Sequence, residues 1–263
     1  MPRKYTYGPY PSRRLGLSLG VDILPKQKLC TFNCVYCEIG PTLKTVSPEY
    51  RISLPPSSEF RKELIDILKY FPHLNSITFG YNGEPTLNEN LLDFYTITKD
   101  VRETMKWTGE KPKITIFTNS STIYSQEIRN KLMKFDVVVA KLDAAISSDF
   151  RRTNQPHDEL PDIDVIIDSL VKLKKIMKEN KLAIQVLIYN SYKKDFLSNN
   201  NEKNIEKLAL AIKTINPDIV QIYSIARIPA QYFVYSIDDN RKKEIVKTFK
   251  EIINNDQIKI EYY

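Results

Sequence analysis

The chain has 263 residues, 42% hydrophobic and 27% charged, which is ordinary composition for a globular protein of one large domain or two small ones. Lys and Arg number 39 against 32 Asp and Glu, so the net charge of +7 favours an anionic partner without naming one. No apolar run is long enough for a transmembrane helix and the N-terminus lacks the apolar core of a signal peptide. We therefore expect a cytoplasmic protein with no membrane partner.

Short apolar runs alternate with amphipathic stretches along most of the chain. The runs are rich in β-branched residues and nearly continuous in apolar side chains, which is typical of strands buried on both faces. In chain order, the six expected strands are 17–24, 76–79, 113–117, 137–142, 183–188 and 219–225.

Apolar residues with the helical period lie between or after these strands. The expected helices are 59–71, 91–107, 123–133, 162–177, 205–212 and 245–253. The polar segment 190–204 is rich in Asn and Ser, so we expect it to form an exposed loop.

Six strand–helix repeats predict an α/β fold of parallel strands. A partial (β/α)6 TIM-like barrel and a doubly wound sheet both match this pattern. No break in composition separates two domains, so we expect a single domain over 1–263. It would comprise an N-terminal extension over 1–16, a core over about 17–226, and a C-terminal helix and short tail over 227–263.

The three cysteines of the chain all lie between the first two expected strands. Cys30, Cys34 and Cys37 have the spacing C-x3-C-x2-C, with the aromatic Tyr36 directly before the last thiol. Three thiols this close suit a soft metal centre, either an iron–sulfur cluster or zinc. Zinc would need a fourth ligand, and neither histidine of the chain has finger-like spacing after the loop.

Three protein ligands on a four-iron cluster leave one iron open for chemistry. This loop resembles that of the radical S-adenosylmethionine (SAM) superfamily, whose members use the open iron to bind the amino acid end of SAM. The resemblance implies a partial TIM-like barrel with the cluster loop after the first strand. It also implies a 4Fe-4S cluster on Cys30, Cys34 and Cys37, SAM as second cofactor, and a low-potential electron donor of the flavodoxin or ferredoxin type.

Two further segments carry the same resemblance. Asn82-Gly83-Glu84-Pro85, after the second strand, is similar to the Gly-Gly-Glu-Pro with which the superfamily holds the methionyl amino group of SAM, with Asn82 in place of the first Gly. A plain Asn-Gly turn would explain Asn82 and Gly83 but not the residues after them. The third strand leads into a segment similar to the superfamily's Thr-Asn-Gly. The resemblance therefore implies cofactor contacts from Asn82, Gly83, Glu84, Thr118, Asn119 and Ser120.

Lys141 and Asp143 end the fourth strand, and residues two apart share a strand face, so both side chains can point into the barrel. The resemblance implies that Lys141 contacts the carboxylate of SAM and Asp143 a ribose hydroxyl. Asp143→Ala would then weaken SAM binding by about 1–3 kcal/mol. The alternative is a structural Lys–Asp pair at the strand end. Gln185, a polar residue in an apolar strand, is a further candidate for the same wall.

Segments 8–22 and 141–157 resemble compact radical SAM proteins grouped with the wyosine-forming transfer RNA enzymes. This makes transfer RNA a candidate substrate, with a small molecule or a protein as the alternatives. Residues 1–55 hold eight Lys and Arg against three Asp and Glu, and the tyrosines among them suit stacking on unpaired bases. An acidic electron donor would favour the same segment. The candidate substrate contacts are Arg13, Arg14, Arg151 and Arg152.

The competing class is an iron–sulfur or nucleic-acid-binding protein without catalytic turnover. A cluster with a purely structural or electron-carrying role usually has four protein ligands. The absence of a fourth cysteine from the sequence therefore favours the enzyme.

Overall fold

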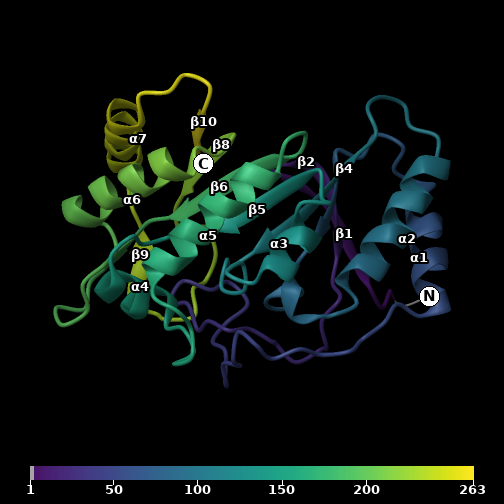
Figure 1. The fold of residues 1–263 in the computed structure, drawn as a ribbon, viewed down its shortest axis with the longest axis horizontal. Coiled ribbons are helices and arrows are strands. Elements are labelled where there is room, and N and C mark those ends of the chain that lie inside the picture. The colour runs from purple at the N-terminus through teal and green to yellow at the C-terminus, as the bar shows by residue number, and fades with distance from the viewer. Residues whose placement is uncertain (1–2) are drawn as a thin grey trace.

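The computed structural model describes residues 3–263. Its main sheet has eight strands in the order β1-β2-β3-β4-β5-β6-β8-β10, and all neighbours except β1 and β2 are parallel. The sheet curls into a half-barrel (Figure 1). Its strands are β1 (Thr6–Ser12), β2 (Gly16–Val21), β3 (Ser76–Phe79), β4 (Lys113–Thr118), β5 (Val137–Lys141), β6 (Lys181–Leu187), β8 (Ile219–Tyr223) and β10 (Lys259–Tyr262).

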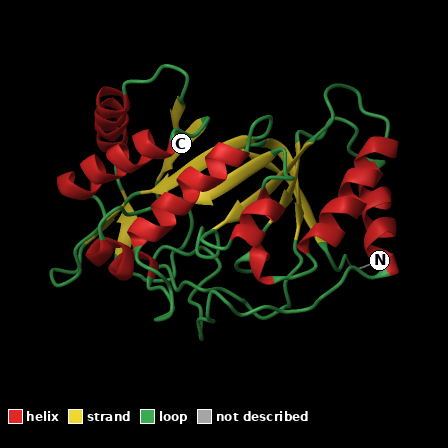
Figure 2. Ribbon diagram, viewed as in Figure 1, coloured by secondary structure: helices red, strands yellow, loops and turns green. Residues whose placement is uncertain are grey.

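The helices lie along the outer face of this sheet (Figure 2). Several begin at a side chain that accepts a backbone N–H, as Asp162 does for Ile163 and Asp238 for Arg241. The helices are α1 (Ser58–Leu68), α2 (Leu91–Thr104), α3 (Gln126–Leu132), α4 (Ser147–Asn154), α5 (Ile163–Ile176), α6 (Glu202–Ile215) and α7 (Asp239–Ile253).

The two faces of the sheet differ in polarity. On β6, Leu182, Ile184 and Val186 belong to the apolar core with the helices, whereas the alternate residue Gln185 points to the inner face. The register places four polar residues side by side on neighbouring strands of that face, although the sequence pattern favoured apolar strands. They are Lys141, Gln185, Gln221 and Glu261.

The sequence-based prediction of a partial (β/α)6 TIM-like barrel is confirmed. All six expected strands and all six expected helices are present, with ends shifted by a few residues. The parallel strands follow one another in chain order, without the reversal that defines a doubly wound sheet. Within residues 3–263, no helix is long and apolar enough to cross a membrane.

Several segments were not foreseen. The expected extension and tail contribute β1 and β10 to the two edges of the sheet, and α4 had no periodic signal. The expectation of an exposed loop over 190–204 is wrong in part, because β7 (Tyr189–Ser191) pairs with β9 (Val234–Ser236) and α6 begins at Glu202. Asn199, within this segment, is fully buried. Its side-chain amide is satisfied there because it donates to the carbonyl oxygens of Asp143 (3.0 Å) and Leu187 (2.7 Å).

Candidate metal and cofactor site

The three cysteines lie in the long loop between β2 and α1, residues 22–57, which runs along the lower edge of the molecule in Figure 1. The carboxyl ends of parallel strands meet at one edge of a barrel, where sites are usually built. The last turn of α4 and the residues after it contact the loop: Val35 N donates to Thr153 O (3.0 Å) and His157 N donates to Thr31 O (2.9 Å). Segment 150–157 therefore supports the cysteine loop.

The segment after β3 supports the loop from another side. Leu29 N donates to Asn82 O (3.0 Å) and Glu84 N donates to Leu29 O (2.9 Å), so the two chains form a short parallel bridge. A Cβ atom on Gly83 would lie 1.7 Å from Leu29 O, and Gly83 has φ +134°. Glycine is thus required here for contact with the backbone of Leu29, next to the first cysteine. Contacts of Asn82 and Gly83 with SAM stay predictions.

Each cysteine sulfur has a nitrogen donor within hydrogen-bonding distance. No disulfide joins the three thiols. Burial raises the pKa of Cys30 to about 11 and that of Cys34 to about 12. Donors of this kind stabilise thiolate ligands, because they offset negative charge on the sulfur. The donors are Asn119 Nδ2 to Cys30 Sγ (3.4 Å), Asn154 Nδ2 to Cys34 Sγ (3.4 Å) and Lys28 Nζ to Cys37 Sγ (3.1 Å).

The three thiols lie on one loop. Within residues 3–263, no group of three or more His, Cys, Asp or Glu side chains is arranged to hold a single metal ion. The metal centre on Cys30, Cys34 and Cys37, an iron–sulfur cluster or zinc, stays a prediction.

Glu84 is fully buried, and its carboxylate connects the end of β3 to the end of β4 through hydrogen bonds. Its carboxylate accepts from the Thr86 hydroxyl (2.6 Å), the Thr118 hydroxyl (3.0 Å) and Asn119 N (2.6 Å). Burial raises the pKa of Glu84, although these hydrogen bonds oppose the shift. Asn119 also donates its side-chain amide to Cys30 Sγ, so Glu84 positions the residue that contacts the first thiol. Ser120, with φ +71°, donates its hydroxyl to Lys141 O (2.8 Å).

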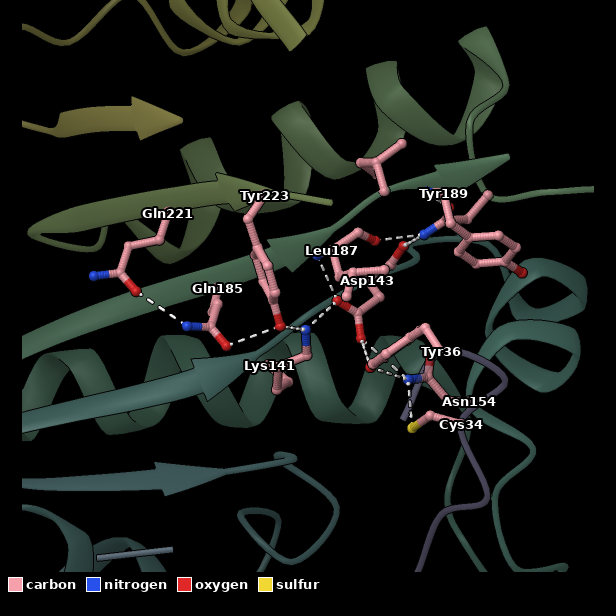
Figure 3. Close-up of polar contacts among 12 residues, drawn as sticks. Cys34, Tyr36, Lys141, Asp143, Asn154, Gln185, Leu187, Tyr189, Gln221 and Tyr223 are labelled. Atoms are coloured by element: carbon pink, nitrogen blue, oxygen red, sulfur yellow. Dashed lines mark hydrogen bonds and ion pairs between the residues drawn. The ribbon is translucent and has the colours of Figure 1, made fainter. Parts of the chain in front are cut away.

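Asp143 is fully buried and both its oxygens are engaged (Figure 3). Oδ1 pairs with Lys141 Nζ (2.8 Å) and accepts from Leu187 N (2.8 Å). Oδ2 accepts from the Tyr36 hydroxyl and from Asn154 Nδ2 (3.1 Å). This geometry favours the structural pair, and a ribose contact from Asp143 stays a prediction.

Lys141 continues the network across the inner face. Its ammonium donates to the Tyr223 hydroxyl (2.8 Å), which donates to Gln185 Oε1 (3.1 Å). Gln185 Nε2 donates in turn to Gln221 Oε1 (3.2 Å). Burial opposes the charge of Lys141, but Asp143 and Tyr223 outweigh that effect and raise the pKa of Lys141. Lys141 is therefore an ammonium with one N–H left for a ligand.

Sequence reasoning missed three members of this network. Tyr36 was noted as an aromatic beside the last cysteine, but its hydroxyl contact with Asp143 has no local signal. Tyr223 lies two residues after Gln221 on β8, so strand alternation could have placed it on the inner face. Asn154 lies at the end of α4, a helix that periodicity did not show.

The four predicted arginines have different environments. Arg13 and Arg151 are exposed. Arg152 pairs with Asp149 and donates to Leu197 O, so its charge is engaged within the protein. Arg14 lies over the ring of Tyr223, with its Cζ 4.5 Å from the ring centroid. Arg13 and Arg14 are adjacent in sequence but differ in environment, since only Arg14 lies against Tyr223. The substrate contacts of all four arginines stay predictions.

Several solved structures share this fold. A radical SAM methyltransferase from Sphaerobacter thermophilus has a TM-score of 0.63 at 15% identity, over 94% of this chain and 65% of that one. Streptococcus suis SuiB bound to S-adenosylmethionine has a TM-score of 0.61 at 16% identity, and this chain spans 50% of its length. TYW1 with a lysine–pyruvate adduct has a TM-score of 0.58 at 15% identity, over 89% and 73%. The chain has the radical SAM fold.

The relationship is closer to proteins known from sequence. UPF0026 protein MJ1312 of Methanocaldococcus jannaschii is 32% identical over 257 residues, which cover 97% of this chain and 74% of that protein. The chain belongs to the UPF0026 family. No protein-family model matches it.

Proposed function

We propose that this chain is a radical SAM enzyme that holds a 4Fe-4S cluster through Cys30, Cys34 and Cys37 and binds SAM beside it. The observation that carries the proposal is the set of three thiols in the loop after β2 of a radical SAM fold, each with a nitrogen donor at its sulfur. When bound, the cluster would pass one electron from a flavodoxin- or ferredoxin-type donor into SAM, yielding methionine and a 5′-deoxyadenosyl radical that abstracts hydrogen from a substrate.

The residues around the loop divide into positioning groups and groups with free donors. Glu84 accepts from Asn119 N and from the Thr118 hydroxyl, and Gly83 lies against the backbone of Leu29. Lys141 has one N–H left after its bonds to Asp143 and Tyr223, and that donor suits the carboxylate of SAM.

Transfer RNA is the substrate that we propose for this enzyme. Its support is the +5 charge of residues 1–55, eight basic against three acidic, together with the exposed Arg13 at the β1–β2 turn. In a titration with bulk transfer RNA, affinity should fall steeply with salt, and Arg13→Ala should flatten that slope by about one unit. If flavodoxin binds at low salt but RNA does not, the basic segment is an electron-donor site.

The experiment is anaerobic iron reconstitution followed by reduction with dithionite in the presence of SAM. Wild-type protein should carry about four iron atoms per chain and form 5′-deoxyadenosine. The triple variant Cys30→Ala, Cys34→Ala, Cys37→Ala should fold without iron and form none. One zinc ion per chain with no iron after anaerobic purification would overturn the proposal.

A further inference from the structure

Arg14 is a partly buried cation without a counter-ion. It lies in the turn between β1 and β2, and its Nη1 is shielded from solvent with no hydrogen-bond partner among residues 3–263. None of the salt bridges in this part of the chain involves Arg14. Its Cζ lies over the ring of Tyr223, 4.5 Å from the ring centroid. A buried donor without a partner is costly, so its presence calls for an explanation.

A second cation shares the same ring. Lys141 Nζ lies 4.6 Å from the centroid of the Tyr223 ring, so the two cationic groups are no more than about 9 Å apart. Asp143 balances the charge of Lys141. The surplus positive charge beside Tyr223 is that of Arg14.

Within residues 3–263, the C-terminal segment offers Arg14 no salt-bridge partner. Tyr263, which lies close enough to Arg14 to feel its charge, donates its hydroxyl to Glu261 Oε2 (2.8 Å). Glu261 Oε1 is already paired with Lys259 at 2.6 Å. Arg14 is therefore left with an uncompensated charge beside the polar inner face.

A guanidinium that lies over an aromatic ring can keep N–H groups free to donate to two oxygens of one oxyanion. We propose that Arg14, on the platform of Tyr223, binds an anionic group of the substrate, a carboxylate or a phosphate, at the inner face of the half-barrel. This inference rests on the proposed function, since it assigns the substrate to the same inner face. In this assignment Lys141 binds the carboxylate of SAM and Arg14 binds the anionic group of the substrate.

The first test measures stability without ligand, comparing Arg14→Met with Lys99→Met, which removes an exposed cation on α2. A residue kept for binding costs stability when the ligand is absent. We expect the urea midpoint of Arg14→Met to equal or exceed that of Lys99→Met. A lower midpoint would show that Arg14 is a structural residue and would overturn the inference.

The second test titrates iron-free protein with sodium phosphate or sodium acetate at constant ionic strength, following the melting temperature. One of the two anions should stabilise wild type and Lys99→Met, which identifies the group as phosphate or carboxylate. Arg14→Met should bind it about tenfold more weakly or worse, and Arg14→Lys should retain part of the affinity.

Equal stabilisation of all variants, or none of wild type, would refute the site. Both tests use protein without cluster or SAM, so failure of the Arg14 site is distinguishable from failure of the proposed function. A chain that binds the anion through Arg14 but forms no 5′-deoxyadenosine would keep the site and refute the enzyme.

Discussion

Asp143→Asn should destabilise the fold rather than only weaken cofactor binding. The substitution removes the charge that balances Lys141, whose side chain is 14% exposed, while that of Asp143 is fully buried. The new amide also places an NH2 group against donors, since each oxygen of Asp143 accepts two hydrogen bonds from the protein.

The magnitude follows from the uncompensated ammonium. Removing one partner of a buried ion pair costs about 3–5 kcal/mol of folding free energy. For a chain of this size that corresponds to a fall in melting temperature of roughly 6–20 °C. The double variant with Lys141→Met should recover part of the loss, because neither charge is then left alone in the barrel.

The assay is urea unfolding of wild type, both single variants, the double variant and Asp168→Asn as control. Asp168 is exposed on α5, so its substitution should change stability by no more than about 0.5 kcal/mol. If Asp143→Asn unfolds at the midpoint of the control but loses affinity for SAM, Asp143 is a ribose contact and the structural reasoning is refuted.

Two further predictions concern the cysteine loop. Gly83→Ala should lower stability by about 1–3 kcal/mol and reduce iron loading, because its Cβ would meet Leu29 O. Gly109→Ala is the control, since open space surrounds that residue, and it should change neither property. Equal iron loading in both variants would contradict the contact between Gly83 and Leu29. Lys28→Gln should make the reduction potential of the reconstituted cluster more negative, since it removes a cationic donor 3.1 Å from Cys37 Sγ. Lys26→Gln, the same charge change at an exposed neighbour, should leave the potential unchanged in an EPR-monitored titration.

The sequence predicted most of the fold because each of the six expected strands has a local signal. Runs such as 113–117 are short and nearly all apolar, and their order along the chain is also their order in the sheet. β1 and β10 were missed because their pairing depends on the rest of the sheet. The same holds for Asn199, whose burial depends on the carbonyl groups that it reaches.

The candidate site was predictable where its chemistry is carried by residues close in sequence. The cysteine spacing and segment 82–85 are local patterns. The contacts between them are not: the bridge from Gly83 to Leu29 and the bond from Asn119 to Cys30 join segments far apart in the chain. The separation of Arg13 from Arg14 likewise depends on where Tyr223 lies across the barrel.

The most direct test of the account is the EPR spectrum of the anaerobically reconstituted, dithionite-reduced protein, recorded with and without SAM. Three cysteine ligands leave one iron of the cluster open, so the signal of the reduced cluster should change when SAM is added. A cluster signal that SAM leaves unaltered, or a protein that takes up no iron, would contradict the claim that Cys30, Cys34 and Cys37 hold a cluster for SAM.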